Sequence, residues 1–218
     1  MTRRPALILI LVAILLPSAA LAKTARHLAV VLDTSTSMRE TSNDRPRLAI
    51  QAIKILADML GPEDRLTLTW MPDSTACEAQ PDPALRIDSR GGDLTAFKQA
   101  VDKQAGYGGP TNFIVPLATA QQALNESKDN ERLLVVISDA GRDSCRADSA
   151  RILRGLRAAG VRTAAVSLGD KGKPAHAEYD IRTAAQDPSE LLQAIGEIYQ
   201  RFLGAKAPDS GKLTPASG

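Results

Sequence analysis

Residues 28–37 read Leu-Ala-Val-Val-Leu-Asp-Thr-Ser-Thr-Ser, and this stretch decides the fold. Its first half is a continuous apolar run, which is typical of a β-strand that is covered on both faces. Its second half places one acid and two serines in alternation, at Asp33, Ser35 and Ser37. A turn at the end of the strand can aim these three side chains at one point, so we expect a buried strand that leads into a polar site.

The remaining sequence alternates between strand and helix patterns. We expect further strands over 65–71, 85–87, 133–137, 161–168 and 178–182, and helices over 46–60, 94–105, 113–124, 147–159 and 188–203. The apolar residues of the 65–71 strand alternate with Thr67 and Thr69, which predicts one less buried face. The helix near residue 94 is expected to open at Asp93. This alternation predicts an α/β domain, doubly wound, with a mostly parallel sheet and helices on both faces.

The N-terminus has the pattern of a secretory signal peptide over residues 1–22. Arg3 and Arg4 precede an apolar run over 6–16, and small residues at 20–22 fit a cleavage site. The run is too short to span about 30 Å of hydrocarbon, although an uncleaved anchor over 6–22 is the alternative. We therefore expect general secretory export rather than a twin-arginine route, and a periplasmic, cell-surface or secreted protein without a membrane span after cleavage.

The amino-acid composition indicates how many domains the chain has and which class of partner it excludes. The chain of 218 residues is 44% hydrophobic, which predicts one domain over 23–203, while the polar residues 204–218 read as a disordered tail or linker. Only 3% of the residues are aromatic, and 27 basic residues nearly balance 25 acidic ones. A nucleic-acid partner is excluded on this basis, because such proteins usually keep a basic excess.

The two cysteines, Cys77 and Cys145, both lie beyond the signal peptide. In an oxidising compartment they can close one disulfide, which we expect. Metal ligation by two lone thiols is the alternative. The two histidines, His27 and His176, are isolated in the sequence and are interpreted as surface or loop residues.

Oxygen-bearing residues follow the predicted strands and suggest a metal centre. Asp33, Ser35 and Ser37 follow the first strand, Thr111 follows a glycine-rich break, and Asp139 follows the 133–137 strand. Ligands meet beyond the carboxyl ends of strands in open α/β sheets. Oxygen ligands without cysteine or histidine favour Mg²⁺, with Mn²⁺ or Ca²⁺ possible, over zinc. The alternative is that the serines only cap the turn.

These motifs resemble the von Willebrand factor type A, or integrin I-like, domain over residues 26–203. The family's metal-ion-dependent adhesion site is matched by Asp33-x-Ser35-x-Ser37, by Thr111 and by Asp139. The resemblance implies a Rossmann-like fold with one short antiparallel edge strand. It also implies that the serines and the threonine hold the ion, with the aspartates often acting through water.

Two loop positions depart from the family pattern. Ala140 follows Asp139 where glycine is common, and Pro110 precedes Thr111. Both changes keep the ligand atoms, so we expect the site to persist with altered affinity. Residues around it, namely Asn112, Arg142 and Asp143, are assigned to a partner-binding rim, with a solvated charged loop as the alternative reading.

Three functions are compatible with this pattern. The first is an exported, non-enzymatic module for adhesion or scaffolding that captures an Asp or Glu carboxylate of a protein partner at its metal. The second is a structural component of an envelope complex with a purely structural metal. The third is a metal-dependent hydrolase, which is disfavoured because residue 35 is a serine where phosphoryl transfer by Asp33 would need a second acid. The oligomeric state is left open.

Overall fold

A computed structural model describes residues 25–39, 44–91, 94–103, 107–129, 131–139, 142–169 and 178–203. The predicted signal peptide (1–22), the predicted tail (204–218) and His176 lie outside the described residues, as do Asp93 and Ala140. Within the described part, no helix is both long and apolar enough to cross a bilayer.

The described residues contain a six-stranded sheet with the order β3-β2-β1-β4-β5-β6. The strands are β1 (Arg26–Leu32), β2 (Arg65–Trp70), β3 (Arg86–Arg90), β4 (Glu131–Ser138), β5 (Arg162–Leu168) and β6 (Ile181–Ala185). Neighbouring strands are parallel except for the β2–β3 pair, which is antiparallel. The predicted fold class, including the antiparallel edge strand, is confirmed.

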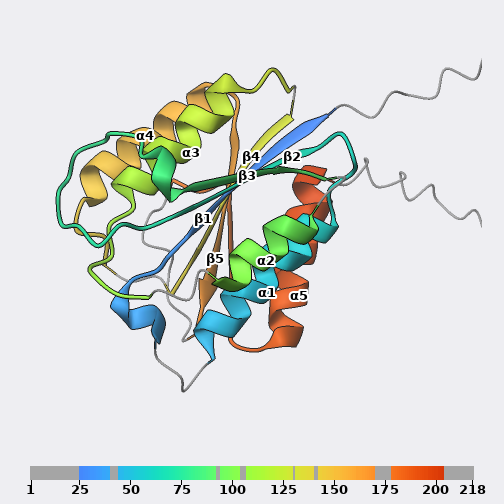
Figure 1. Ribbon diagram of the computed structural model, residues 1–218, viewed down its shortest axis with the longest axis horizontal. Helices are drawn as coiled ribbons and strands as arrows, with labels where there is room; N and C mark the ends of the chain where they lie inside the picture. Colours follow the sequence, from blue (N-terminus) through green and yellow to red (C-terminus); the bar gives the residue numbers. More distant parts are fainter. Residues whose placement is uncertain are drawn as a thin grey trace, which may run out of the picture.

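Helices cover both faces of this sheet (Figure 1). The α-helices are α1 (Arg45–Asp58), α2 (Thr95–Lys103), α3 (Ile114–Glu126), α4 (Arg146–Ala158) and α5 (Pro188–Ile198). Short turns of 3₁₀-helix, η1 (Thr36–Arg39) and η3 (Pro83–Leu85), precede α1 and β3, and a π-helical turn, η4 (Tyr199–Leu203), follows α5. One face carries α1, α2 and α5, and the other carries α3 and α4.

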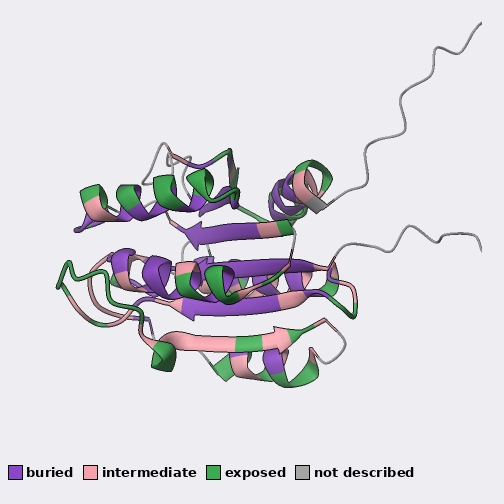
Figure 2. Ribbon diagram, turned by 90° about the horizontal axis from the view of Figure 1, so that it is seen from above, coloured by how far each residue is buried: buried purple, intermediate pink, exposed green. Residues whose placement is uncertain are grey.

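The apolar side chains of β1 pack alternately against the helices on the two faces of the sheet. Leu28, Val30 and Leu32 pack with α1, α2 and α5, while Ala29 and Val31 pack with α3 and α4. All five side chains are 0% exposed. Figure 2 shows the central strands buried along most of their length. An unbroken apolar strand is therefore required, because side chains alternate between two covered faces.

The expectation of a less buried face on β2 is wrong. Thr67 and Thr69 are both 0% exposed, because α3 packs across this part of the sheet. The Thr69 hydroxyl donates to the backbone oxygen of Pro116 at 3.2 Å. Alternation in the sequence therefore marks a change of polarity here rather than a change of burial.

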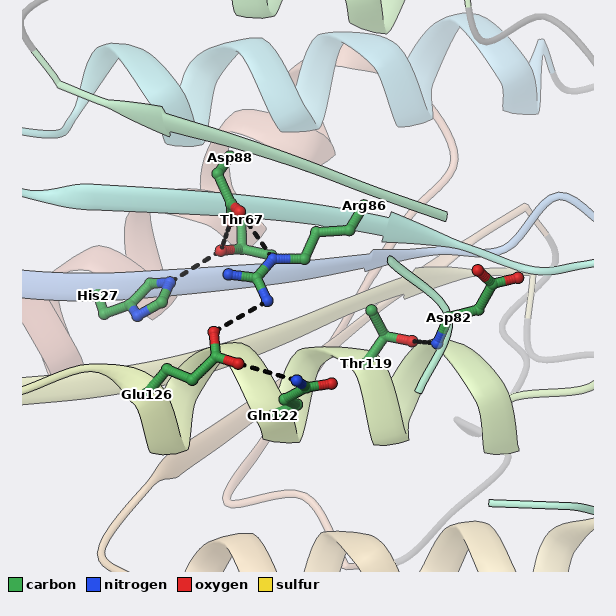
Figure 3. A network of polar contacts seen from close by, with 8 residues as sticks. All are labelled: His27, Thr67, Asp82, Arg86, Asp88, Thr119, Gln122 and Glu126. Atoms are coloured by element: carbon green, nitrogen blue, oxygen red, sulfur yellow. Dashed lines mark hydrogen bonds and ion pairs between the residues drawn. The ribbon is translucent and has the colours of Figure 1, made fainter. Parts of the chain in front are cut away.

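The interpretation of His27 as a surface residue is also wrong. His27 is 1% exposed, and its Nε2 lies 2.9 Å from Thr67 Oγ1. The Thr67 hydroxyl donates to Asp88 at 2.6 Å, and Arg86 joins Asp88 to Glu126 through contacts of 2.7 and 3.2 Å (Figure 3). This polar network ties the edge strand β3 to the neighbouring strands and to α3.

Several helices and strands begin or end a few residues away from the predicted boundaries. Asp44 precedes α1 with a left-handed backbone (φ 48°), and its side chain makes no capping hydrogen bond. The last strand covers 181–185 rather than 178–182. Its short apolar pattern did not define where pairing with β5 starts.

Candidate metal centre

The candidate site lies where the strand order reverses. The chain passes from β1 to β2 on one side and from β4 to β5 on the other, while β1 and β4 are direct neighbours. The Asp33 amide donates to the Ile137 carbonyl at 2.9 Å, which continues the β1–β4 ladder into the first loop. Asp33 and Asp139 therefore leave the carboxyl ends of adjacent strands, where open α/β sheets form a crevice.

Asp33 is fixed by hydrogen bonds from both loops. Its Oδ1 accepts from the Ser35 amide at 2.9 Å, and its Oδ2 accepts from the Ser138 hydroxyl at 2.6 Å. Burial raises the pKa of Asp33 above its ordinary value and the charge of Asp139 acts in the same direction, while the bonds from Ser138 and Ser35 oppose the shift. A buried carboxylate beside another acid is an environment that a nearby cation would relieve.

The hydroxyls of Ser35 and Ser37 are neighbours. The 3₁₀ turn after β1 brings their Oγ atoms to 3.1 Å, and Ser35 is 1% exposed. Hydroxyl hydrogen bonds are usually about 2.7–2.8 Å long. Two adjacent oxygens on an octahedral cation with bonds of about 2.1 Å would be about 3.0 Å apart. The spacing of the two oxygens therefore fits the edge of a coordination octahedron.

The glycine loop is bonded to the first loop. The Gly108 amide donates to the Thr34 carbonyl at 2.7 Å, and the Thr36 amide and hydroxyl donate to the Gly109 carbonyl at 3.1 and 3.0 Å. Gly109 has φ 80°, and a Cβ there would lie 2.4 Å from Asp73 Oδ1. Glycine is thus required by conformation and by space.

Thr111 follows this loop and is tied to the third one. Its carbonyl accepts from the Ser144 amide at 2.9 Å and from the Ser144 hydroxyl at 3.0 Å. The predicted disulfide between Cys77 and Cys145 is confirmed, with Cα atoms 5.4 Å apart. It joins the segment after β2 to the start of α4, directly after Ser144. Hydrogen bonds therefore link the loop after β1 to the glycine loop, and the glycine loop to the loop after β4. The disulfide fixes the end of the loop after β4.

Two of the three residues predicted for the partner-binding rim are buried and hydrogen-bond to the backbone of nearby loops. Asn112 is 0% exposed and donates to two carbonyls of the 74–76 segment at 2.9 Å each. Asp143 is 5% exposed and accepts from the Cys145 amide at 2.9 Å. Burial rules out Asn112 and Asp143 as an exposed rim, which corrects that assignment, whereas Arg142 is exposed.

Sequence reasoning missed Arg45. Its Nη1 donates to Asp139 Oδ2 at 3.0 Å and to the Ser37 carbonyl at 3.1 Å. The Arg45 and Asp139 side chains are only 10% and 4% exposed. Arg45 and Asp139 are 94 positions apart, and no local pattern marked this arginine as part of the site.

A buried hydroxyl also lies in the electrostatic field of Asp33. Tyr107 is 6% exposed, and its hydroxyl has no hydrogen-bond partner among the described residues. Burial raises the pKa of Tyr107 to about 12, and the Asp33 charge adds to this effect. Such an orphaned donor suits a site that takes up water along with an ion.

The donor chemistry fits a hard divalent cation. The residues that meet here offer hydroxyl and carboxylate oxygens, which are the ligands of Mg²⁺, Mn²⁺ and Ca²⁺. Among the described residues there is no group of three or more His, Cys, Asp or Glu side chains that could hold a metal. The paired hydroxyls of Ser35 and Ser37 beside Asp33 are therefore the oxygen donors that the described contacts bring together here.

Solved structures with the same fold come from several sources. A von Willebrand factor type A protein from Catenulispora acidiphila has a TM-score of 0.66 at 18% identity, covering 84% of this chain and 44% of the other. The pilus adhesin SpaC from Lactobacillus rhamnosus GG gives 0.61 at 12% identity, covering 82% and 31%. Proximal thread matrix protein 1 from the mussel byssus, with a zinc-occupied adhesion motif, gives 0.59 at 18% identity, covering 81% and 46%.

The chain thus spans less than half the length of these three proteins, and at such identities the likeness establishes the fold alone. No curated protein matches the sequence. The family model of the von Willebrand factor type A domain matches residues 28–142, which is more than half of the chain and includes Asp33, the glycine loop and Asp139. Sequence and fold agree, and the chain belongs to the von Willebrand factor type A domain family.

Proposed function

We propose that the chain is an exported protein-binding module, for adhesion or scaffolding, that depends on a divalent metal ion, with Mg²⁺ as the physiological ion. Its partner is a protein that offers an Asp or Glu carboxylate. The observation that carries this proposal is the 3.1 Å spacing of the Ser35 and Ser37 hydroxyls beside a buried, doubly hydrogen-bonded Asp33.

Each residue of the site has a distinct role in this proposal. Ser35, Ser37 and Thr111 supply neutral oxygens to the ion. Asp33 and Asp139 act through water, because the oxygens of Asp33 already accept from Ser35 and Ser138 and Asp139 accepts from an arginine. A divalent ion held mainly by neutral ligands supplies a positive centre that attracts an anionic side chain.

The relatives and the N-terminus support the same role. The pilus adhesin from Lactobacillus rhamnosus GG is an adhesin by its description, and the mussel protein carries zinc at its adhesion motif. The charged and apolar pattern over residues 1–22 supports export to the periplasm, cell surface or exterior. Binding is proposed rather than catalysis, because Ser35 stands where phosphoryl transfer by Asp33 would need an acid.

Metal binding tests the proposal directly. Purified chain that lacks residues 1–22 is titrated with Mn²⁺, which can be followed by its paramagnetic signal. Wild type should bind one ion, and Asp33→Asn and Ser35→Ala should lose this binding. Ser127→Ala is the matched control, because Ser127 lies between the end of α3 and the amino end of β4, whereas the site lies at the carboxyl end of β4, and it bonds to Asp129. Unaltered binding in Ser35→Ala would refute the site.

Partner capture tests the second half of the proposal. Wild-type protein should retain a partner from envelope extract in Mg²⁺, release it in EDTA and recover it when Mg²⁺ returns, whereas Asp33→Asn should capture nothing. Circular dichroism of Asp33→Asn should match wild type. Loss of secondary structure in this variant would instead favour the structural-metal alternative.

A further inference from the structure

Arg45 is held between two loops of the site. It is the first residue of α1, follows the left-handed Asp44, and is 8% exposed. Its Nη1 bonds both Asp139 Oδ2, at the end of β4, and the Ser37 carbonyl, in the loop after β1. One guanidinium nitrogen thereby links the first and third loops.

The end of β5 makes room for this guanidinium. Gly169 follows β5 with φ 92°, and a Cβ there would lie 2.5 Å from Arg45 Nε and 3.0 Å from Cζ. The Gly169 amide bonds the Ala185 carbonyl at 3.0 Å, so this backbone is itself anchored. The guanidinium is therefore packed against a fixed backbone as well as bonded to Asp139.

The site thus carries a fixed positive charge of its own. Asp33 and Asp139 contribute two negative charges, and Arg45 offsets one of them at a contact distance of 3.0 Å. Two further charges, Arg39 and Asp73, flank the glycine loop, but both are exposed and opposite in sign, so solvent screens them. Among the described residues, Asp33, Asp139 and Arg45 are the buried charged side chains at the carboxyl ends of β1 and β4.

We propose that Arg45 is a built-in counter-cation that lowers the affinity of the site for a divalent ion and makes binding of that ion depend on an anionic ligand. This inference rests on the proposed metal site. A divalent ion in a site of net charge −1 leaves an excess positive charge, which a ligand carboxylate then neutralises. By linkage, the carboxylate raises the affinity for the metal by the same factor as the metal raises the affinity for the carboxylate.

Substitution of Arg45 tests this idea by direct metal titration. In Arg45→Gln, the affinity for Mn²⁺ should rise about tenfold or more, because a buried positive charge near the ion is removed. Arg45→Lys keeps the charge and should stay close to wild type. Arg47→Gln is the matched control, because Arg47 lies on the same helix turn, is exposed and pairs only with Asp44 among the ion pairs of the described residues.

Acetate serves as the carboxylate probe. Saturating acetate should raise the Mn²⁺ affinity of wild type by a clearly larger factor than that of Arg45→Gln. Equal or weaker Mn²⁺ binding in Arg45→Gln, or equal acetate effects in the two proteins, would overturn the inference. If wild type and Asp33→Asn bind Mn²⁺ alike, the metal site itself fails. If only Asp33→Asn loses binding and Arg45→Gln matches wild type, the role of Arg45 alone is refuted.

Discussion

Acidification should destabilise this protein through His27. The Thr67 hydroxyl donates to Asp88, so His27 Nε2 must donate to Thr67 and Nδ1 is left as an acceptor, without a partner among the described residues. Burial lowers the pKa of His27 from 6.5 to about 4, and the charge of Arg65 adds to this shift. The native state therefore keeps the ring neutral where the unfolded chain protonates it.

The size of the effect follows from these two pKa values. Between the unfolded pKa and the folded pKa the unfolded state binds more protons, so the free energy of unfolding falls as the pH falls. The full difference between 6.5 and about 4 corresponds to roughly 3 kcal/mol, of which about 2 kcal/mol is lost by pH 5. His27 is 1% exposed, so solvent screening reduces this little.

Urea unfolding at pH 7.5 and pH 5.0 measures this loss in wild type and in His27→Gln. Glutamine keeps a donor that can reach the Thr67 hydroxyl and removes the titrating ring. Wild type should lose about 2 kcal/mol more than His27→Gln between the two pH values. Other titrating groups contribute equally to both proteins. Parallel losses in the two proteins would show that His27 keeps an ordinary pKa in the native state.

Two further predictions concern stability. Asp64 accepts hydrogen bonds from the Arg26 amide and guanidinium and from the Gly61 amide, and both side chains of the Arg26–Asp64 ion pair are 3% exposed. Asp64→Asn leaves the Arg26 charge buried without its partner, so it should lower the free energy of unfolding in urea by about 3–5 kcal/mol. A cost below about 1 kcal/mol would show that the pair is replaceable. Replacing Cys77 and Cys145 together by serine should cost about 4 kcal/mol, because the disulfide closes a loop of 68 residues. Thiol titration of the denatured wild type should find no free thiol, which checks that the disulfide is formed before the variant is compared with it.

Much of the fold could be predicted because burial and local pattern agree in the central strands. The apolar runs at 28–32 and 133–137 occur where both sheet faces are covered, so the sequence alone marks β1 and β4. The predictions for Thr67 and His27 are wrong because each side chain is polar yet buried beside a hydrogen-bond partner from another strand. Burial of a polar side chain depends on such long-range partners, which no window of sequence contains.

Some residues of the candidate site could likewise be predicted from the sequence, and others could not. Asp33, Ser35 and Ser37 lie within one turn, so their spacing could be read directly. Arg45 reaches Asp139 from 94 positions away, and the burial of Asn112 depends on a segment 36 and 38 positions away. These contacts arise from how the loops pack, and only the structure could place them.

The close approach of Arg45 to Gly169 has an evolutionary consequence. Any side chain at 169 would push the guanidinium away from Asp139, so a relative that acquires a larger residue there should also have given up its arginine at 45. The two positions should therefore change as a pair across descendants of this chain, and lineages could adjust how readily the site accepts a cation by that paired exchange while leaving every oxygen ligand intact.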